Sequence, residues 1–375
     1  MRPGDLIGPV EIGPVAHGGH CVARLDGRVV FVRHVLPGEL VTARVTEVAK
    51  RFARADAAEV LRASPERVEP PCAAAGECGG CDFQHVRPRF QAELKRRVMA
   101  EQLRRLAGLE WSGAVEQVAP VTGSRVRMRF VTDDEGKLGL RAHRSHRVVP
   151  LPGGRCAIAD PAMPLEPPPA EPGTEWLGLV GDSGGALVSP DAGGVVAESV
   201  GGRRFEVSTD GFWQAHVRAP EVLTRAVLDG VRPAAGERAF DLYCGVGVFA
   251  GALADAGCRV WGIEGNRDAV GRARTNVPEA RFFAGSVDRT LRRLPARADL
   301  VVLDPPRAGA GRTVMAAVAQ LRPRAVAYVA CDPAALARDL GFARDHGLEV
   351  ESIRAFDLFG MTHHLEAVAI LHPVH

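Results

Sequence analysis

The chain has 375 residues, of which 46% are hydrophobic and 25% charged, and its formal net charge is +2. This length predicts two or three domains with a sizeable core, and the composition is that of a globular protein. No stretch approaches the roughly 18–20 apolar residues of a membrane span, and the N-terminus lacks a secretion signal. We therefore expect a cytoplasmic protein that has no membrane partner, and no obligate protein partner is evident.

Residues 1–62 predict a small β-barrel. Runs such as VVFVRHV and ELVTARVTEV carry β-branched residues and are separated by Gly and Pro. Several short strands in so few residues favour an oligonucleotide-binding type of barrel, with a generic β-module as the alternative.

Residues 63–208 predict a central domain with a cysteine cluster. The spacing of Cys72, Cys78 and Cys81 is typical of thiolate ligands, and Cys156 is the best candidate for a fourth. Spacing alone leaves zinc, a [4Fe–4S] cluster and loose loop cysteines open. A charged helix is predicted over roughly 90–106, and we expect the segment 90–108 to pack on the catalytic domain.

The rest of the central segment predicts strands, with an extended, helix-free connection over 160–176. Basic residues gather between 85 and 150, as in RVRMR. The small net charge does not itself predict a nucleic-acid binder, and each basic run alone reads as a solvated face. Their concentration in one stretch modestly favours a polyanion partner.

Residues 209–375 alternate strand and helix, ending in a predicted hairpin over ESIRAFDLF and HHLEAVAILHP. This pattern predicts a doubly wound, Rossmann-like α/β sheet, the fold class of S-adenosylmethionine-dependent methyltransferases.

A nucleotide site is predicted where DLYCGVGVF leaves the first strand of this sheet. Gly245 permits close approach of a ligand, and Glu264, about 20 residues on, can accept ribose hydroxyls. Asp288 follows the third strand, where it can meet an adenine edge. The full GxGxxG of nicotinamide enzymes is absent, which favours S-adenosylmethionine over a dinucleotide.

Two further motifs point to chemistry on a base. In LDPPRAG, Asp304 ends a strand, and Arg307 stands where amino-methylating enzymes carry an aromatic residue; a tight loop without a role is the alternative. Cys331 lies between a strand and a helix N-terminus, a setting that predicts a lowered thiol pKa. A thiolate that adds to C6 of uracil makes C5 nucleophilic, and a base must then remove the C5 proton. Glu366 is the best candidate for that base. A buried apolar cysteine is the alternative reading of Cys331.

Together these motifs resemble the RNA uracil-C5 methyltransferase family, in its TRAM-domain, iron–sulfur branch typified by bacterial 23S rRNA enzymes. GFWQAH, DLYCGVGVF, DPPRAG, YVACDPAALARD and FDLFGMTHHLE match its motifs in order. The resemblance implies a TRAM domain over 1–62, Cys331 as nucleophile and Glu366 as base. It also implies a [4Fe–4S] cluster on the four cysteines. It implies cofactor contacts from Gln214, Tyr243, Glu264 and Asp304, and it places Phe212 and Gln214 near the target base, where we also expect Arg307. Asp332, Val248 and Gly360-Met361 depart from the family pattern.

The resulting hypothesis is an enzyme that makes 5-methyluridine, most favourably in 23S rRNA. The same chemistry on tRNA is the first alternative. An inactive RNA-binding relative and a redox enzyme are the alternatives from other classes; intact Cys331 and Glu366 argue against the former, and no electron-partner motif supports the latter.

Overall fold

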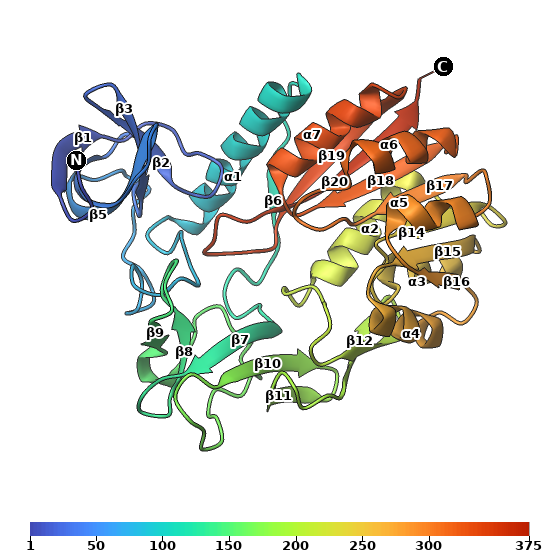
Figure 1. Ribbon diagram of the computed structural model, residues 1–375, viewed down its shortest axis with the longest axis horizontal. Helices are drawn as coiled ribbons and strands as arrows, with labels where there is room; N and C mark the ends of the chain where they lie inside the picture. The colour runs from blue at the N-terminus through green and yellow to red at the C-terminus, as the bar shows by residue number, and fades with distance from the viewer. Residues whose placement is uncertain (375) are drawn as a thin grey trace.

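The computed structural model describes residues 1–374. A small barrel opens the chain (blue in Figure 1), in the sheet order β1-β4-β5-β3-β2, and β1 also contacts β2. Alternate residues such as Val30 and Val32 of β3 are fully buried, as expected of a strand with one face on a core. The strands are β1 (Leu6–Glu11), β2 (Cys21–Leu25), β3 (Arg28–Arg33), β4 (Leu40–Val48) and β5 (Phe52–Arg62).

The central part of the chain is mainly an antiparallel sheet in the order β11-β10-β7-β8-β9, followed by the hairpin β12–β13 (Figure 1). Residues 160–174 contain no helix, as predicted for 160–176, but the last two residues of that stretch, Glu175 and Trp176, begin strand β10. The elements are β7 (Arg127–Thr132), β8 (Leu138–Arg141), β9 (Val148–Pro150), a 3-10 turn (Pro152–Gly154), β10 (Glu175–Gly181), β11 (Gly184–Val188), β12 (Val195–Val200) and β13 (Arg203–Ser208).

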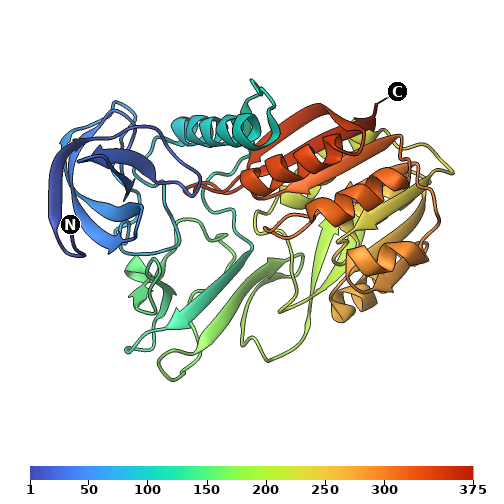
Figure 2. The ribbon, with the colours of Figure 1, turned by 45° about the horizontal axis from the view of Figure 1, so that its top comes forward.

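The C-terminal part is the doubly wound sheet that the sequence predicts, in the order β16-β15-β14-β17-β18-β20-β19-β6. Along β17, Leu300 and Val302 join one apolar core while Val301 and Leu303 join another, so helices cover both faces (Figure 2). Its elements are α2 (Ala219–Val231), β14 (Arg238–Leu242), α3 (Val248–Asp255), β15 (Arg259–Glu264), α4 (Arg267–Asn276), β16 (Arg281–Ala284), α5 (Val287–Thr290), a 3-10 turn (Leu291–Arg293), β17 (Leu300–Leu303), α6 (Gly311–Gln320), β18 (Ala325–Ala330), α7 (Pro333–Arg344), β19 (Leu348–Asp357) and β20 (Glu366–Pro373).

Helix α1 (Pro88–Gln102) joins the barrel to the catalytic sheet (teal in Figures 1 and 2). It continues as a π-helical turn (Leu103–Ala107). Leu94 and Val98 pack into the barrel core, whereas Met99 and Leu103 pack into the core that contains α7 residues. The next strand, β6 (Val115–Gln117), pairs in parallel with β19 and forms the edge of the catalytic sheet. No helix within residues 1–374 is long and apolar enough to cross a membrane.

Candidate functional site

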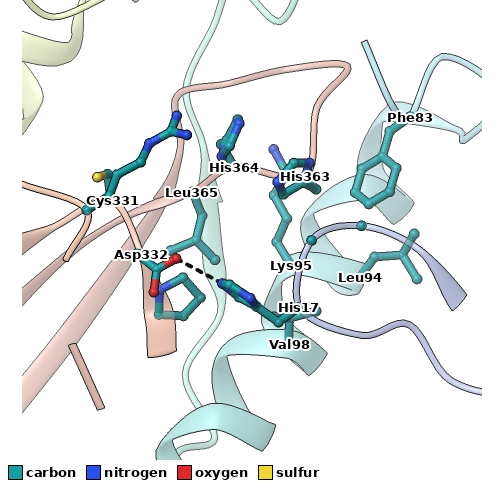
Figure 3. Close-up of a pocket in the computed structure, with 14 residues that line it drawn as sticks. His17, Phe83, Leu94, Lys95, Val98, Cys331, Asp332, His363, His364 and Leu365 are labelled. Carbon is teal, nitrogen blue, oxygen red and sulfur yellow. Dashed lines mark hydrogen bonds and ion pairs between the residues drawn. The ribbon is translucent and has the colours of Figure 1, made fainter. Parts of the chain in front are cut away.

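The predicted nucleophile and base stand at the ends of neighbouring strands, since Cys331 directly follows β18 and Glu366 is the first residue of β20. β18 and β20 pair antiparallel, with Val329 opposite Val368 and Ala330 opposite Ala367. One further step of this register places Cys331 opposite Glu366. The Cys331 side chain lines a cavity of about 190 Å³ (Figure 3), and Glu366 is 4% exposed.

The electrostatics at Cys331 contradict the lowered thiol pKa that the helix N-terminus predicts. Burial, followed by the charges of Glu366 and Asp304, raises the pKa of the Cys331 thiol to about 12, while Arg307 acts in the opposite direction. Burial and then Asp304 also raise the pKa of Glu366 well above its ordinary value. Desolvation and nearby carboxylates therefore outweigh the helix terminus, and thiolate formation needs compensation at this site.

The loop that carries Asp304 and Arg307 is fixed by hydrogen bonds to a side chain of α7. Asp339 is fully buried, accepts hydrogen bonds from the Ala310 amide at 2.6 Å and the Gly311 amide at 3.1 Å, and also accepts one from the Tyr328 hydroxyl at 2.6 Å. Burial, followed by the charge of Glu264, raises the pKa of Asp304 to about 7. The loop thus delivers one acid and, in Arg307, one exposed cation beside Cys331.

A second hollow collects residues predicted to contact the cofactor. Gln214, Tyr243, Gly245 and Asp304 line it, together with Phe212, which is 74% exposed. Its volume of about 50 Å³ is below the ~300 Å³ of ordinary ligand pockets.

The backbone of the turn beneath this hollow is unusual. Tyr243 has φ of +64° and Gly245 of +51°, in the left-handed region that a side chain rarely adopts. Glu264 accepts a hydrogen bond from the Gly245 amide at 3.1 Å, which ties the two predicted motifs together. Asp288 is exposed and does not line the hollow, but its charge acts on Tyr243.

Asp241 has an oxygen that could meet a ligand. It is fully buried at the end of β14; its Oδ2 accepts from the Ala250 amide at 2.8 Å, while its Oδ1 has no partner among the described residues. A buried acceptor without a partner is costly, and a donor group on a bound molecule would satisfy it.

Sequence reasoning missed the residues that other parts of the chain bring to the nucleophile. His17, Gly18 and Gly19 of the barrel, with Lys95 of α1, line the same cavity as Cys331 (Figure 3). In the sequence, the position of Lys95 beside the apolar residues Leu94 and Val98 on one helix is a weak indication of a buried cation. Nothing in the sequence around His17 indicates its role.

The four predicted metal ligands gather in one region without forming a ligating group. The charges of Cys72 and Cys156 act on Cys78, those of Cys78 and Cys156 act on Cys81, and that of Cys72 acts on Cys156. Burial is the largest cause that raises the pKa of Cys78, Cys81 and Cys156. Yet within residues 1–374 no three His, Cys, Asp or Glu side chains are arranged to hold a metal ion.

Comparisons with known proteins place this site in a family. The model of the TRAM domain matches residues 8–58, and that of tRNA (uracil-5-)-methyltransferase matches residues 288–374, which include Cys331 and Glu366. An uncharacterized RNA methyltransferase of Streptomyces avermitilis is 45% identical, over 97% of this chain and 98% of its own length. The chain belongs to the tRNA (uracil-5-)-methyltransferase family. It is therefore an RNA methyltransferase, with an N-terminal TRAM domain.

One more relative and one solved structure are similar to this chain. An uncharacterized RNA methyltransferase of Streptomyces coelicolor is 44% identical, over 99% of this chain and 94% of its own length. Among solved structures, the tRNA (uracil-54, C5)-methyltransferase of Pyrococcus abyssi, in complex with S-adenosyl-L-homocysteine, superposes with a TM-score of 0.73. It covers 97% of this chain and 99% of its own at 23% identity, and this likeness speaks for the fold.

Proposed function

We propose that this enzyme uses S-adenosylmethionine to form 5-methyluridine in RNA. The observation that carries the proposal is the pairing of β18 with β20: its register, continued by one residue, sets Cys331 opposite Glu366, and the charge of Glu366 acts on the Cys331 thiol. Methylation of uracil C5 requires a nucleophile and a base that can both reach the same uracil ring.

In the proposed mechanism, Cys331 loses its proton to solvent and its sulfur adds to C6 of the target uracil. The electrons of the C5–C6 double bond move toward O4, and C5 becomes nucleophilic. Bound S-adenosylmethionine would supply the electrophilic methyl group that C5 takes up, and would leave as S-adenosylhomocysteine. Glu366 then removes the C5 proton; the C5–C6 double bond re-forms and the C6–S bond breaks, which returns the thiolate. The burial that raises the pKa of Glu366 makes its carboxylate a stronger base than an exposed one.

The hollow beside β14 is the proposed cofactor site. Gln214, Tyr243, Glu264 and Asp304 are assigned to the cofactor, with Gly245 at the turn and Asp288 toward the adenine. A cationic sulfonium suits the carboxylate of Asp304, and the free Oδ1 of Asp241 suits a donor on the ligand. Phe212 and Gln214, with Arg307, are assigned to the target base.

A larger cavity offers a path for the RNA on either side of that base. It has a volume of about 630 Å³, lies between the barrel and the central domain, and shares His17, Gly18, Gly19 and His363 with the cavity at Cys331. The Arg54 guanidinium lies 5.7 Å from the Phe31 ring centre in its wall, and Arg144 enters from the other side. Cations with aromatic faces suit a nucleic-acid strand whose bases are unstacked.

We further propose that Cys72, Cys78, Cys81 and Cys156 hold a [4Fe–4S] cluster. Four thiols are the donor type that such a cluster takes, although they must move closer together to ligate it. Arg125, whose guanidinium feels the charges of Cys81 and Cys156, would offset the negative charge of a thiolate-bound cluster. The cluster would cross-link the 72–81 loop to the loop at Cys156. No step of the methylation runs through it.

The proposed substrate is 23S rRNA, favoured by the resemblance of the cysteine loop to the ribosomal branch. tRNA is the second candidate, because the matched family model and the Pyrococcus abyssi structure are both described by tRNA activity. The enzyme is to be incubated with 23S rRNA fragments and tRNA tritiated at uracil C5, with and without S-adenosylmethionine, beside a Cys331→Ala control. Cofactor-dependent tritium release from one RNA supports the chemistry and names the substrate. No release from either RNA, with the cofactor bound, contradicts the proposal.

A further inference from the structure

A loop of the N-terminal barrel reaches the nucleophile turn of the catalytic sheet. His17 Nε2 lies 2.9 Å from Asp332 Oδ2, a contact that spans 315 residues (Figure 3). Gly19, two residues on, has φ of +80°, and a Cβ at this position would lie 2.5 Å from the Cβ of His363. The loop is therefore packed closely against both sides of the cavity that contains Cys331.

Asp332 uses both of its carboxylate oxygens at this contact. Its Oδ1 accepts hydrogen bonds from the amides of Ala334 at 3.0 Å and Ala335 at 2.8 Å, which caps α7. Its Oδ2 faces His17. Asp332 also follows Cys331 directly in the chain, so whatever fixes this carboxylate also fixes the peptide that carries the thiol.

The charge of Asp332 opposes the ionisation of Cys331. It is one of three carboxylates that raise the pKa of the thiol, after Glu366 and Asp304, and Arg307 opposes them. An imidazolium at His17 cancels part of this negative charge. The hydrogen bond with Asp332 raises the pKa of His17 in spite of its burial, which favours that cation.

We propose that His17 of the TRAM domain is a positioning residue for the nucleophile, which pairs with Asp332 so that the Cys331 thiolate forms beside a closed ion pair. This rests on the proposed role of Cys331. Docking of the barrel then completes the nucleophile site, in addition to any contact that the barrel makes with RNA.

Other charged groups face the His17–Asp332 pair and change how readily His17 is protonated. Arg105 beyond α1 lowers the pKa of His17, and Glu101 raises it. Lys95 lines the cavity but is bound to Asp357, and His363 and His364 stand on the far wall. The His17 side chain is 42% exposed, so solvent screens the pair and its effect is moderate.

The test compares His17→Ala, His17→Gln, Asp332→Asn and the double variant His17→Ala/Asp332→Asn in the full-length enzyme. The first readout is the rate at which iodoacetamide alkylates Cys331, followed across pH by mass spectrometry of the peptide that contains it. This rate depends on the thiolate and needs neither RNA nor cofactor, so it remains informative if uracil methylation itself fails. Turnover with RNA against pH is the second readout.

We expect His17→Ala to shift the alkylation profile toward higher pH by up to one unit, which is about tenfold less thiolate at a fixed neutral pH. The double variant His17→Ala/Asp332→Asn should have an alkylation profile close to that of the unaltered enzyme. His17→Gln should shift the profile as much as His17→Ala does. The control is His372→Ala, which removes an exposed histidine from its 2.5 Å contact with Glu351 far from the cavity, and should change nothing.

Two results would overturn the proposal. An alkylation profile unchanged in His17→Ala would show that the pair does not act on the thiol. An equal shift with and without Asp332→Asn would show that His17 acts through another group. Circular dichroism of each variant separates these outcomes from loss of folding, and Asp332→Asn alone, which keeps an oxygen to cap α7, tests the pair without altering the barrel.

Discussion

The buried ammonium of Lys95 lies 2.5 Å from Asp357 Oδ1 and also donates to the carbonyl of Phe359 at 3.0 Å. Neither side chain of the pair is exposed by more than 2%. Helix α1 is thereby joined to the end of β19, where the chain turns toward Glu366. Gln91, one turn earlier on α1, accepts from the Met361 amide at 2.9 Å and supports the same turn.

Replacement of Lys95 by Met should destabilise the enzyme by about 3–5 kcal/mol, because Asp357 is left buried without its cation. The free energy of unfolding, measured in urea, checks this. Adding Asp357→Asn should recover part of the loss. The matched control is Lys137→Met, since the Lys137–Glu135 pair is exposed and screened by solvent and should contribute little to stability. Equal, small losses at both lysines would contradict the structural role of the buried pair.

Replacement of Glu366 by Gln should leave addition of Cys331 to the RNA possible and slow the release of product. We expect a protein–RNA adduct to accumulate, visible as a shifted band of labelled RNA on a denaturing gel, with turnover lowered by about 10²–10⁴-fold. Glu349→Gln, an exposed glutamate of β19, is the control and should turn over normally.

The counterpart is Cys331→Ala, which should bind RNA but form no adduct. An adduct in this variant would assign the nucleophile to another cysteine. Rapid turnover of Glu366→Gln would remove Glu366 from its role as base.

Local sequence patterns predicted the parts of the site that lie at the ends of individual strands. Strand–turn–helix punctuation indicated the ends of β14 and β18, and the predicted final hairpin put Glu366 on a strand. The structure adds that this strand, β20, pairs with β18. The contacts that hold these groups were invisible in the sequence, because Lys95–Asp357 spans 262 residues and His17–Asp332 spans 315. The prediction of a lowered pKa for Cys331 was wrong for a related reason. The helix terminus is a local feature that the sequence shows, whereas burial and the nearby carboxylates arise from tertiary packing.

Replacement of Cys156 by Ser should abolish the proposed iron–sulfur cluster. It removes the one proposed ligand outside the 72–81 loop, and three remaining thiolates hold a [4Fe–4S] cluster less firmly. Iron and acid-labile sulfide per chain, after anaerobic purification, are the measurements. Cys258→Ser is the control, since that thiol points to the Ala234 carbonyl at 3.6 Å in the catalytic domain. Stoichiometric zinc, or no metal in the unaltered enzyme, would contradict the proposal.

Cofactor affinity should depend on pH through Asp304. Burial and Glu264 raise the pKa of this acid to about 7, so it is a carboxylate above that pH and neutral below it. A cationic sulfonium favours the carboxylate, and the affinity for S-adenosylmethionine should therefore fall as the pH drops below 7, by up to about tenfold per unit. Calorimetric titrations between pH 5.5 and 8.5 test this. In Asp304→Asn the affinity should no longer depend on pH in this range and should stay at the weaker value that the unaltered enzyme shows at acidic pH.

Asp288→Asn is the control. That carboxyl is exposed and its pKa is lowered by its hydrogen bond with Ser286, so the dependence near pH 7 should persist without it. A profile that stays steep in Asp304→Asn would assign the titration to another group at the hollow.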